Sequence, residues 1–261
     1  MAMTSGDDYL AAAKQYPTIS KTGARTLVAG IPFSMFDIAG QPGAGTLAAG
    51  NTANGIVPDD TLAGYPPIDT LAAIGYLTIS DFSWSVAGRL TIYDRLFSAG
   101  AYAFNDDITL AAQPSYAARL PGTDYKNLQL WIETVTAFTG NPSFQINYLD
   151  EGGAAGDTGV VGSGAALTIG RMFRLPLAAG DAGVSQIVRV RGTVASVGTF
   201  NVNVMRRLWS GRVMVAGGGD THDLFKTGAR QVYGTSALFM QVTADGTGSG
   251  ISEVAMEISD K

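Results

Sequence analysis

From about residue 70 onward, apolar and polar residues alternate along the chain with a period of two. This period places every second side chain on the same face of a β-strand, whereas an amphipathic helix repeats every 3.6 residues. In residues 200–205 (Phe-Asn-Val-Asn-Val-Met), the pattern turns the apolar side chains toward a core and the asparagines toward water. Residues 128–137 alternate in the same way, with Glu133 opposite to Ile132. The pattern predicts antiparallel sheets with one buried face and one wet face.

Eight segments carry this strand pattern, and turn-forming residues separate them. The segments are residues 70–79, 83–97, 128–137, 143–149, 186–194, 200–208, 237–242 and 253–258. The turns are rich in Gly, Asp, Asn and Pro, as in residues 121–124, 140–142, 150–153, 180–183 and 217–220. Glu and Lys, which populate exposed helix faces, total only nine. Many short strands with frequent turns predict an all-β protein, an antiparallel β-sandwich or jelly roll over residues 70–261.

The first part of the chain, residues 1–69, has a different character. Residues 5–15 form a helix candidate that Ser5 can cap and Pro17 ends. Residues 22–68 are rich in Gly and Pro, which predicts a long, largely irregular N-terminal arm. A second helical turn is expected somewhere in the ambiguous stretch 221–232.

An apolar cluster lies within this arm and needs an explanation, because a free linker has no reason to carry one. The cluster consists of Ile31, Phe33, Met35, Phe36 and Ile38. Two interpretations stay open: an ordered loop packed on its own domain, or an extended arm that uses these side chains to dock on a neighbouring subunit. The second interpretation predicts that removing residues 1–68 leaves a soluble, folded sandwich.

Composition excludes several classes of protein. With 46% hydrophobic and 15% charged residues, the chain does not fit intrinsic disorder, and no apolar run reaches the ~20 residues of a membrane helix. The net charge is −5 and no basic block occurs, so we expect no nucleic-acid partner. Arg189, Arg191, Arg206 and Arg207 are interpreted as the solvent face of a sheet or as ion-pair partners. The first residues lack the pattern of a signal peptide, so we expect synthesis in a host cytoplasm.

No motif predicts catalysis, a metal site or a cofactor. The chain has no Cys and one His, His222, which we interpret as a surface turn residue because no nucleophile motif accompanies it. Residues 245–250 resemble a calcium loop faintly, but Met256 stands where the bidentate Glu belongs, so a hairpin turn is expected. The adjacent pairs at 59–60 and 106–107 are Asp-Asp, and neighbouring side chains in a strand point apart. We therefore expect a protein that is not an enzyme.

Short phrases between residues 75 and 215 resemble virion structural proteins of tailed bacteriophages, above all head decoration or minor capsid proteins. The phrases are residues 90–97 (LTIYDRLF), 139–143 (TGNPS), 147–148 (NY), 156–159 (GDTG), Met172 and 177–184 (LAAGDAGV). The resemblance implies a β-sandwich or jelly roll that clamps neighbouring capsomers, often as a trimer. Its partners would be further copies of itself and a major capsid protein, with neither nucleic acid nor membrane.

The leading hypothesis is thus a non-enzymatic capsid decoration (cement) protein, located on the outer surface of a phage head. One alternative is a tail tube or connector-region protein that forms hexameric rings. The other is a β-sandwich adhesin that binds glycans in a groove lined by Trp84, Trp131 or Trp209.

Overall fold

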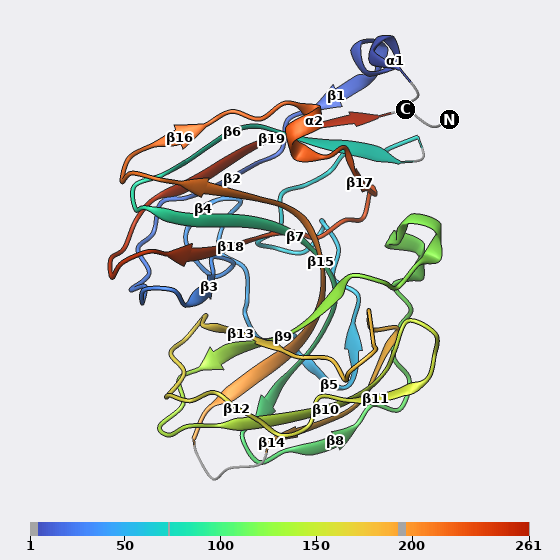
Figure 1. Cartoon of the computed structure of the whole chain (residues 1–261), viewed down its shortest axis with the longest axis vertical. Coiled ribbons are helices and arrows are strands. Elements are labelled where there is room, and N and C mark those ends of the chain that lie inside the picture. The colour runs from blue at the N-terminus through green and yellow to red at the C-terminus, as the bar shows by residue number, and fades with distance from the viewer. Residues whose placement is uncertain (1–4, 73, 193–196, 261) are drawn as a thin grey trace. The chain divides into compact units, whose positions relative to one another are not determined.

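The computed structural model describes residues 5–72, 74–192 and 197–260, and it confirms the all-β class with antiparallel, sandwich-like sheets (Figure 1). The chain forms two compact units. Unit 1 contains residues 1–45, 59–94 and 208–261, and unit 2 contains residues 46–58 and 95–207. The predicted division at residue 69 does not coincide with a boundary of these units.

Unit 1 is built from two groups of antiparallel strands. The first group follows the order β16-β6-β19-β2-β4, with β1 paired to β19 and β17 paired to β6. Its strands are β1 (Ala13–Gln15), β2 (Thr18–Lys21), β4 (Gly40–Gln41), β6 (Gly75–Trp84), β16 (Gly219–Asp220), β17 (Arg230–Val232) and β19 (Ser252–Asp260). In the second group, β18 (Leu238–Ala244) lies between β3 (Pro32–Ser34) and residues 88–94 of β7 (Gly88–Ala103). Apolar side chains of both groups, such as Ile79 and Leu90, belong to one buried core.

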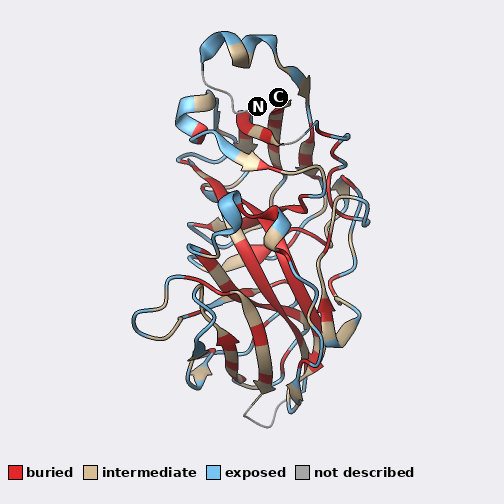
Figure 2. Cartoon of the chain, turned by 90° about the vertical axis from the view of Figure 1, so that its right-hand side faces the viewer, coloured by how far each residue is buried: buried red, intermediate tan, exposed pale blue. Residues whose placement is uncertain are grey.

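Unit 2 is a sandwich with its own core. One sheet contains β5 (Asn51–Ile56), β9 (Leu128–Thr136), β13 (Met172–Leu175) and the remaining parts of β7 and β15 (Thr199–Val213). The other contains β8 (Asp107–Thr109), β10 (Ser143–Leu149), β11 (Ala155–Asp157), β12 (Val161–Gly162) and β14 (Gln186–Gly192). Phe144 of β10 and Phe200 of β15 meet edge-on with ring centroids 4.8 Å apart. Figure 2 shows the central strands largely buried and the helices and turns largely exposed.

Seven of the eight predicted strands are confirmed with shifted ends: the segment 143–149 matches β10, whereas β15 extends to Val213, beyond the predicted end at residue 208. The segment 83–97 is wrong as a single strand, because it contains the end of β6, a bend at residues 85–87 and the start of β7. The first helix, α1 (Gly6–Ala11), is shorter than expected. Ser5 caps it as predicted by accepting a hydrogen bond from the Asp8 amide at 3.1 Å. The helix ends early because residues 13–15 pair with β19 instead. The predicted helical turn is α2 (Leu224–Thr227), and two short 3₁₀ turns lie at η1 (Ala117–Arg119) and η2 (Pro121–Thr123).

The prediction of a wet sheet face is wrong for β9 and β15. Asn201, Asn203 and Glu133 are fully buried, because other parts of unit 2 cover this face. Glu133 forms an ion pair with Arg95 at 3.0 Å and accepts a hydrogen bond from Asn203 at 3.2 Å. Ser98 donates to the Asn203 side-chain oxygen at 2.7 Å. The polar side chains of the alternating pattern in β9 and β15 therefore form a buried hydrogen-bonded network with Arg95 and Ser98 of β7.

The apolar cluster of the predicted arm packs inside its own unit. Phe33, Met35 and Phe36 are buried, while Ile31 and Ile38 are half-buried against the same core. The segment that carries this cluster therefore agrees with the first interpretation, an ordered loop packed on its own domain. A later part of the predicted arm, residues 46–58, belongs to unit 2. Contact of these side chains with a neighbouring subunit would require them to leave this core, and it stays a prediction.

Two glycines of this segment show why it needs small residues. A Cβ atom on Gly45 would lie 2.4 Å from the Phe36 ring. Gly64 has a φ of +100°, which few other residues adopt, and its Cβ would lie 2.5 Å from the same ring. The glycines thus permit close approach of the backbone to a core aromatic side chain of the same unit.

The buried polar network gives a stability prediction. Replacing Glu133 with Ala leaves the Arg95 guanidinium buried without its carboxylate, so we expect the free energy of unfolding to fall by about 3–5 kcal/mol. The double variant Arg95→Met/Glu133→Leu should lose clearly less than the two single variants combined. Glu253→Ala, at a half-buried glutamate of β19, is the control with little expected effect. Urea unfolding measures these variants together with the single variants Arg95→Met and Glu133→Leu; a loss below about 1 kcal/mol for Glu133→Ala would contradict the network's role.

A truncation tests how the N-terminal segment packs. Residues 1–68 supply β1–β5 and the buried side chains of Phe33, Met35 and Phe36. Their removal opens both cores, so we expect a chain without cooperative thermal unfolding, contrary to the soluble sandwich expected of an external arm. Removing residues 1–12 is the control, since α1 contains no buried residue. Cooperative unfolding of the 69–261 fragment in circular dichroism would refute this expectation.

Candidate functional site

Four exposed apolar side chains lie on loops at one end of unit 1. Val28, Met214, Val215 and Ile251 are 47%, 73%, 70% and 53% exposed. We call these four residues the loop-tip patch. Their loops lie at the left edge of unit 1 in Figure 1. An apolar surface of this kind is unfavourable in water and is typical of a contact surface.

Backbone hydrogen bonds hold these loops together. The Gly217 amide donates to the Trp84 carbonyl at 3.0 Å, and the Ser85 amide donates to the Ile251 carbonyl at 3.0 Å. The Leu27 amide reaches the Gly248 carbonyl at 2.8 Å. The apolar side chains are therefore presented by neighbouring, cross-linked turns.

An exposed ion pair stands beside this patch. The side chains of Arg212 and Asp245 approach to 3.1 Å. Arg212 lies just before Met214 in the sequence, and Asp245 begins the turn that ends at Ile251. Both side chains are about half exposed, so the pair contributes little to folding stability. An apolar centre with charged residues at its edge is typical of a protein–protein interface.

A cleft of about 700 Å³ lies elsewhere in unit 1, between α1 and α2. Its polar and aromatic lining comes from the outer face of β6 and β19 and from the two helical segments. The lining side chains used below are Tyr9, Tyr76, Thr78, Ser80, His222, Phe225 and Glu257. We call it the α1–α2 cleft. Residues 76, 78 and 80 alternate with the core residues Leu77 and Ile79, so the period of two places them on the cleft side.

Glu257 links the helix α1 to the floor of this cleft. Its Oε1 accepts hydrogen bonds from the Tyr9 hydroxyl and from Lys14, whose Nζ lies at 2.7 Å. Burial alone would raise the pKa of the Glu257 carboxyl, but these hydrogen bonds outweigh it and hold the pKa below its ordinary value. The hydrogen bond to Glu257 likewise raises the pKa of Lys14. Both groups are charged at neutral pH.

His222 lies at the cleft wall and is more buried than the predicted surface residue, with 17% of its side chain exposed. Its Nδ1 accepts a hydrogen bond from Trp209 Nε1 at 3.0 Å, and its Nε2 lies 3.7 Å from an Asp220 carboxylate oxygen. Its ring also meets Phe82 edge-on. These contacts explain the residue as a structural link between β15, β6 and the loop before α2.

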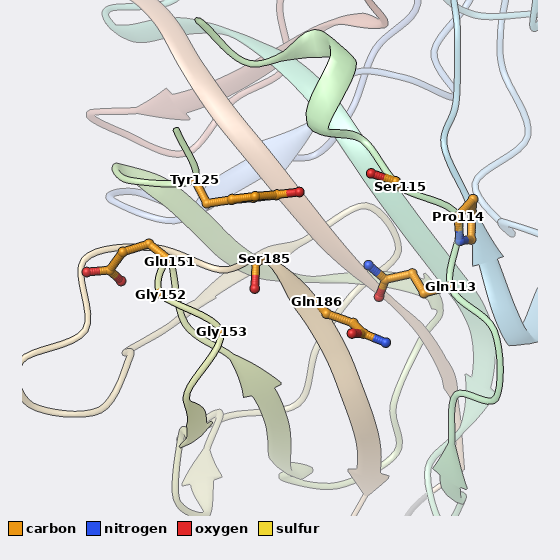
Figure 3. A pocket seen from close by; sticks show the side chains of 9 residues that line it. All are labelled: Gln113, Pro114, Ser115, Tyr125, Glu151, Gly152, Gly153, Ser185 and Gln186. Atoms are coloured by element: carbon orange, nitrogen blue, oxygen red, sulfur yellow. The ribbon is translucent and has the colours of Figure 1, made fainter. Parts of the chain in front are cut away.

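Unit 2 has a hollow of about 430 Å³ with a polar lining (Figure 3). Tyr125 lies above Ser185 in this view, with Glu151 on one side and Gln113 on the other. Glu151 accepts a hydrogen bond from the Ala182 amide at 2.9 Å, and Gln113 accepts one from the Ile187 amide at 2.8 Å. These polar side chains hold neighbouring loops and already have partners.

The remaining sequence-predicted candidates have structural roles. Residues 245–250 form the turn between β18 and β19, as expected. Asp59 and Asp60 cap separate backbone amides, those of Thr61 and Ile68. Asp106 accepts from the Ala103 amide at 2.7 Å.

The arginines of β14 are ion-pair partners, as predicted. Asp107 binds Arg189 at 2.5 Å and Arg191 at 3.2 Å. The hydrogen bond from Arg189 lowers the pKa of the Asp107 carboxyl.

The described part of the chain contains no group of three or more His, Asp or Glu side chains that could hold a metal ion. None of its helices is long and apolar enough to cross a membrane. Trp84, Trp131 and Trp209 are each at most 5% exposed, so they line no open groove and the tryptophan-lined glycan site is wrong.

Comparison with known proteins gives little guidance. No family model and no curated protein matches the chain. A structure of infectious bursal disease virus, strain Gx, aligns over 95% of this chain and 81% of its own, with 11% identity and a TM-score of 0.18. A structure of T=1 particles derived from infectious bursal virus aligns over 95% and 78%, with 9% identity and a TM-score of 0.17. TM-scores this low carry no argument about fold or function.

The ion pair of Lys14 and Glu257 predicts a pH dependence. The folded pKa of Glu257 lies below its ordinary value of 4.5, so its stabilising effect is complete above about pH 4.5 and is lost as the pH falls through the folded pKa. Glu257→Gln should therefore lower the thermal midpoint at pH 7 and approach the wild type at pH 2–3. Asp245→Asn, which breaks the exposed pair with Arg212, is the control with a smaller effect. A difference between wild type and Glu257→Gln that stays constant from pH 7 to pH 2 would argue against this ion pair.

Proposed function

We propose that the protein is a non-enzymatic structural component of a virus particle, a capsid decoration protein that binds the outside of a tailed-phage head and bridges capsomers. The loop-tip patch is the observation that carries this proposal. It provides an apolar contact surface on turns that are cross-linked by backbone hydrogen bonds, where a partner can cover it without unfolding the unit.

The energetics of the patch suit a lattice contact. Full burial of a Val, Ile or Met side chain contributes about 1.5–3 kcal/mol, and four such side chains can offset part of the entropic cost of association. A single contact of this size is weak. An oligomer, such as a trimer, presents several copies at once, so its contacts strengthen one another through a high effective concentration. The proposed partners are therefore other copies of this chain and a major capsid protein.

The sequence resemblance supports the finer assignment to the head surface. The phrases that carry it lie in β7, β10, β11 and β13 and in the turns beside them. The low share of charged residues, 15%, agrees with a protein that keeps much of its surface covered in an assembly.

Charge insertion into the patch tests the proposal. Val215→Asp and Met214→Asp should weaken binding to phage heads assembled without the protein by about tenfold or more, since a carboxylate would have to be desolvated at the contact. Both side chains are at least 70% exposed, so the fold should be unaffected. Val160→Asp, at a 62% exposed valine of unit 2, is the matched control.

Cosedimentation with heads measures the affinity, and electron microscopy locates the bound protein. Binding on the outside of heads that Val215→Asp abolishes and Val160→Asp retains would support the assignment. Wild-type binding by Val215→Asp would contradict it. Stacked hexameric annuli of the purified protein would instead identify a tail tube or connector component.

A further inference from the structure

Two dipeptides of this chain have the covalent chemistry to rearrange their own backbone. They are Asn54-Gly55 and Asp245-Gly246, the only Asn-Gly and Asp-Gly pairs in the sequence. Glycine has no Cβ atom to shield its amide nitrogen, so this nitrogen can attack the side-chain carbonyl carbon of the residue before it. The product is a five-membered succinimide ring, and the fold decides whether the two atoms can meet.

The packing of unit 2 restrains Asn54-Gly55 against this ring closure. Gly55 is buried with a φ of +70°, and a Cβ atom on it would lie 2.1 Å from the Phe97 ring, so its backbone has no room to turn. The Asn54 amide donates to Asn51 Oδ1 at 2.9 Å, and Asn54 Oδ1 accepts from the Ala112 amide at 3.2 Å. Both reacting groups are therefore fixed.

Asp245-Gly246 has the opposite environment. Both residues are exposed in the turn between β18 and β19. Within the described part of the chain, the Gly246 amide has no hydrogen-bond partner. A Cβ atom on Gly246 would have no atom of a non-neighbouring residue within 4 Å. The nitrogen that would attack is thus neither bonded nor enclosed.

The Asp245 carboxylate is held only weakly. Arg212 binds it at 3.1 Å, but both side chains are about half exposed, and an exposed ion pair of this kind opens at little cost. The turn is anchored on either side of the reacting bond. The Asp245 amide donates to the Ala87 carbonyl at 3.0 Å, and the Gly248 carbonyl accepts from the Leu27 amide at 2.8 Å. The 245–246 peptide bond between these anchors can therefore turn.

We propose that Asp245 is a site of spontaneous isomerisation to isoaspartate in the folded protein, whereas the fold protects Asn54. The Gly246 nitrogen forms a bond to Asp245 Cγ, and one carboxylate oxygen leaves as water with the amide proton and one proton from solvent. Water then opens the ring and the proton returns to solvent. Attack at Cγ restores aspartate, and attack at the main-chain carbonyl carbon of Asp245 gives isoaspartate. The two steps together change no mass.

Isoaspartate would alter the turn that leads to Ile251 of the loop-tip patch. The main chain then runs through Cβ and Cγ and is one carbon longer, between the anchors at Ala87 and Leu27. The free carboxylate is attached directly to Cα, so its reach toward Arg212 is one bond shorter. This modification site stands independently of the proposed capsid role.

Incubation at neutral pH and physiological temperature for several weeks tests the proposal, with the folded protein and the chain in guanidinium chloride side by side. Methyl transfer from S-adenosylmethionine by a protein isoaspartate methyltransferase detects isoaspartate, and electron-transfer mass spectrometry of peptides locates it. In the folded protein we expect isoaspartate at residue 245 and an unchanged Asn54. In guanidinium chloride Asn54 should react first, because an amide is a better electrophile than a negatively charged carboxylate and Gly55 is no longer packed on Phe97.

Two glycine variants of the same turn separate this chemistry from general ageing. Gly246→Ala should slow isomerisation by about fivefold or more, because the added Cβ shields the attacking nitrogen. Its thermal midpoint should not change, since the Cβ enters open space and Gly246 does not have a positive φ. Gly248→Ala is the matched control, because its Cβ would meet Val86 at an ordinary 3.7 Å and leaves the reacting atoms unchanged.

Isoaspartate at residue 245 that Gly246→Ala suppresses and Gly248→Ala retains would support the proposal. The proposal is overturned if the folded protein accumulates no isoaspartate at residue 245, or if Gly246→Ala accumulates it at the wild-type rate. Deamidation of Asn54 at the same rate in the folded and the unfolded chain would overturn the protection by the fold.

Discussion

The charge of Glu133 is the constraint on which the organisation of unit 2 depends. A fully buried carboxylate is tolerated only when an opposite charge and hydrogen-bond donors surround it, and Arg95 and Asn203 supply both. The network continues through Asn201, whose side chain donates to the Leu47 carbonyl and accepts from the Ala49 amide. The polar face of the sheet therefore holds the beginning of segment 46–58, and this explains why a Gly-rich segment is ordered there.

The same segment is fixed along its length by other buried donors. The Tyr102 hydroxyl donates to the Thr52 carbonyl at 2.9 Å, and the Arg119 guanidinium binds the Pro58 carbonyl. Arg119 also donates to the Arg95 carbonyl at 3.0 Å, so it joins the end of the segment to the strand that carries the ion pair. Irregular backbone has carbonyl groups without strand partners, and in unit 2 side chains of the sheet and of η1 satisfy them.

In unit 1, the buried ammonium group of Lys21 satisfies the carbonyl groups of an irregular segment. Lys21 of β2 donates to the Pro42 carbonyl at 2.9 Å and to the Ile38 carbonyl at 3.2 Å. Burial lowers the pKa of Lys21 to about 8. The loop that follows β3 is thus held by a donor to its carbonyls as well as by Phe33 and Phe36 in the core. In both units, segments without regular structure become part of a core because polar side chains of neighbouring elements satisfy their backbone.

Local periodicity explains how much of this fold could be predicted. The period of two locates β10 to the residue, because alternation is a property of the strand itself. It locates the other long strands with ends up to about six residues off, and it joins the end of β6 to the start of β7. It does not reveal what covers each face. Asn201 was expected to face water because its neighbours alternate, but its cover lies about 150 residues away, at Leu47. The cluster at Phe33 is likewise visible as apolar in the sequence, whereas the pairing of its strand β3 with β18 is not.

The candidate sites were harder to predict for the same reason. The α1–α2 cleft joins Tyr9, Thr78, His222 and Glu257, which are far apart in the sequence and match no spaced motif. Thr78 looks like an ordinary polar residue of a strand, and only the missing partner of its hydroxyl distinguishes it. The loop-tip patch had a weak signal, since Met214 and Val215 directly precede a glycine-rich turn where apolar residues are unexpected.

The α1–α2 cleft and the loop-tip patch lie at different positions along β6. Thr78 lies at the floor of the cleft, whereas Trp84, six residues on, is hydrogen-bonded to the loop that follows Met214 and Val215. At about 3.3 Å per residue, the strand separates them by about 20 Å. A partner that covers the loop-tip patch can therefore leave the cleft open to solvent.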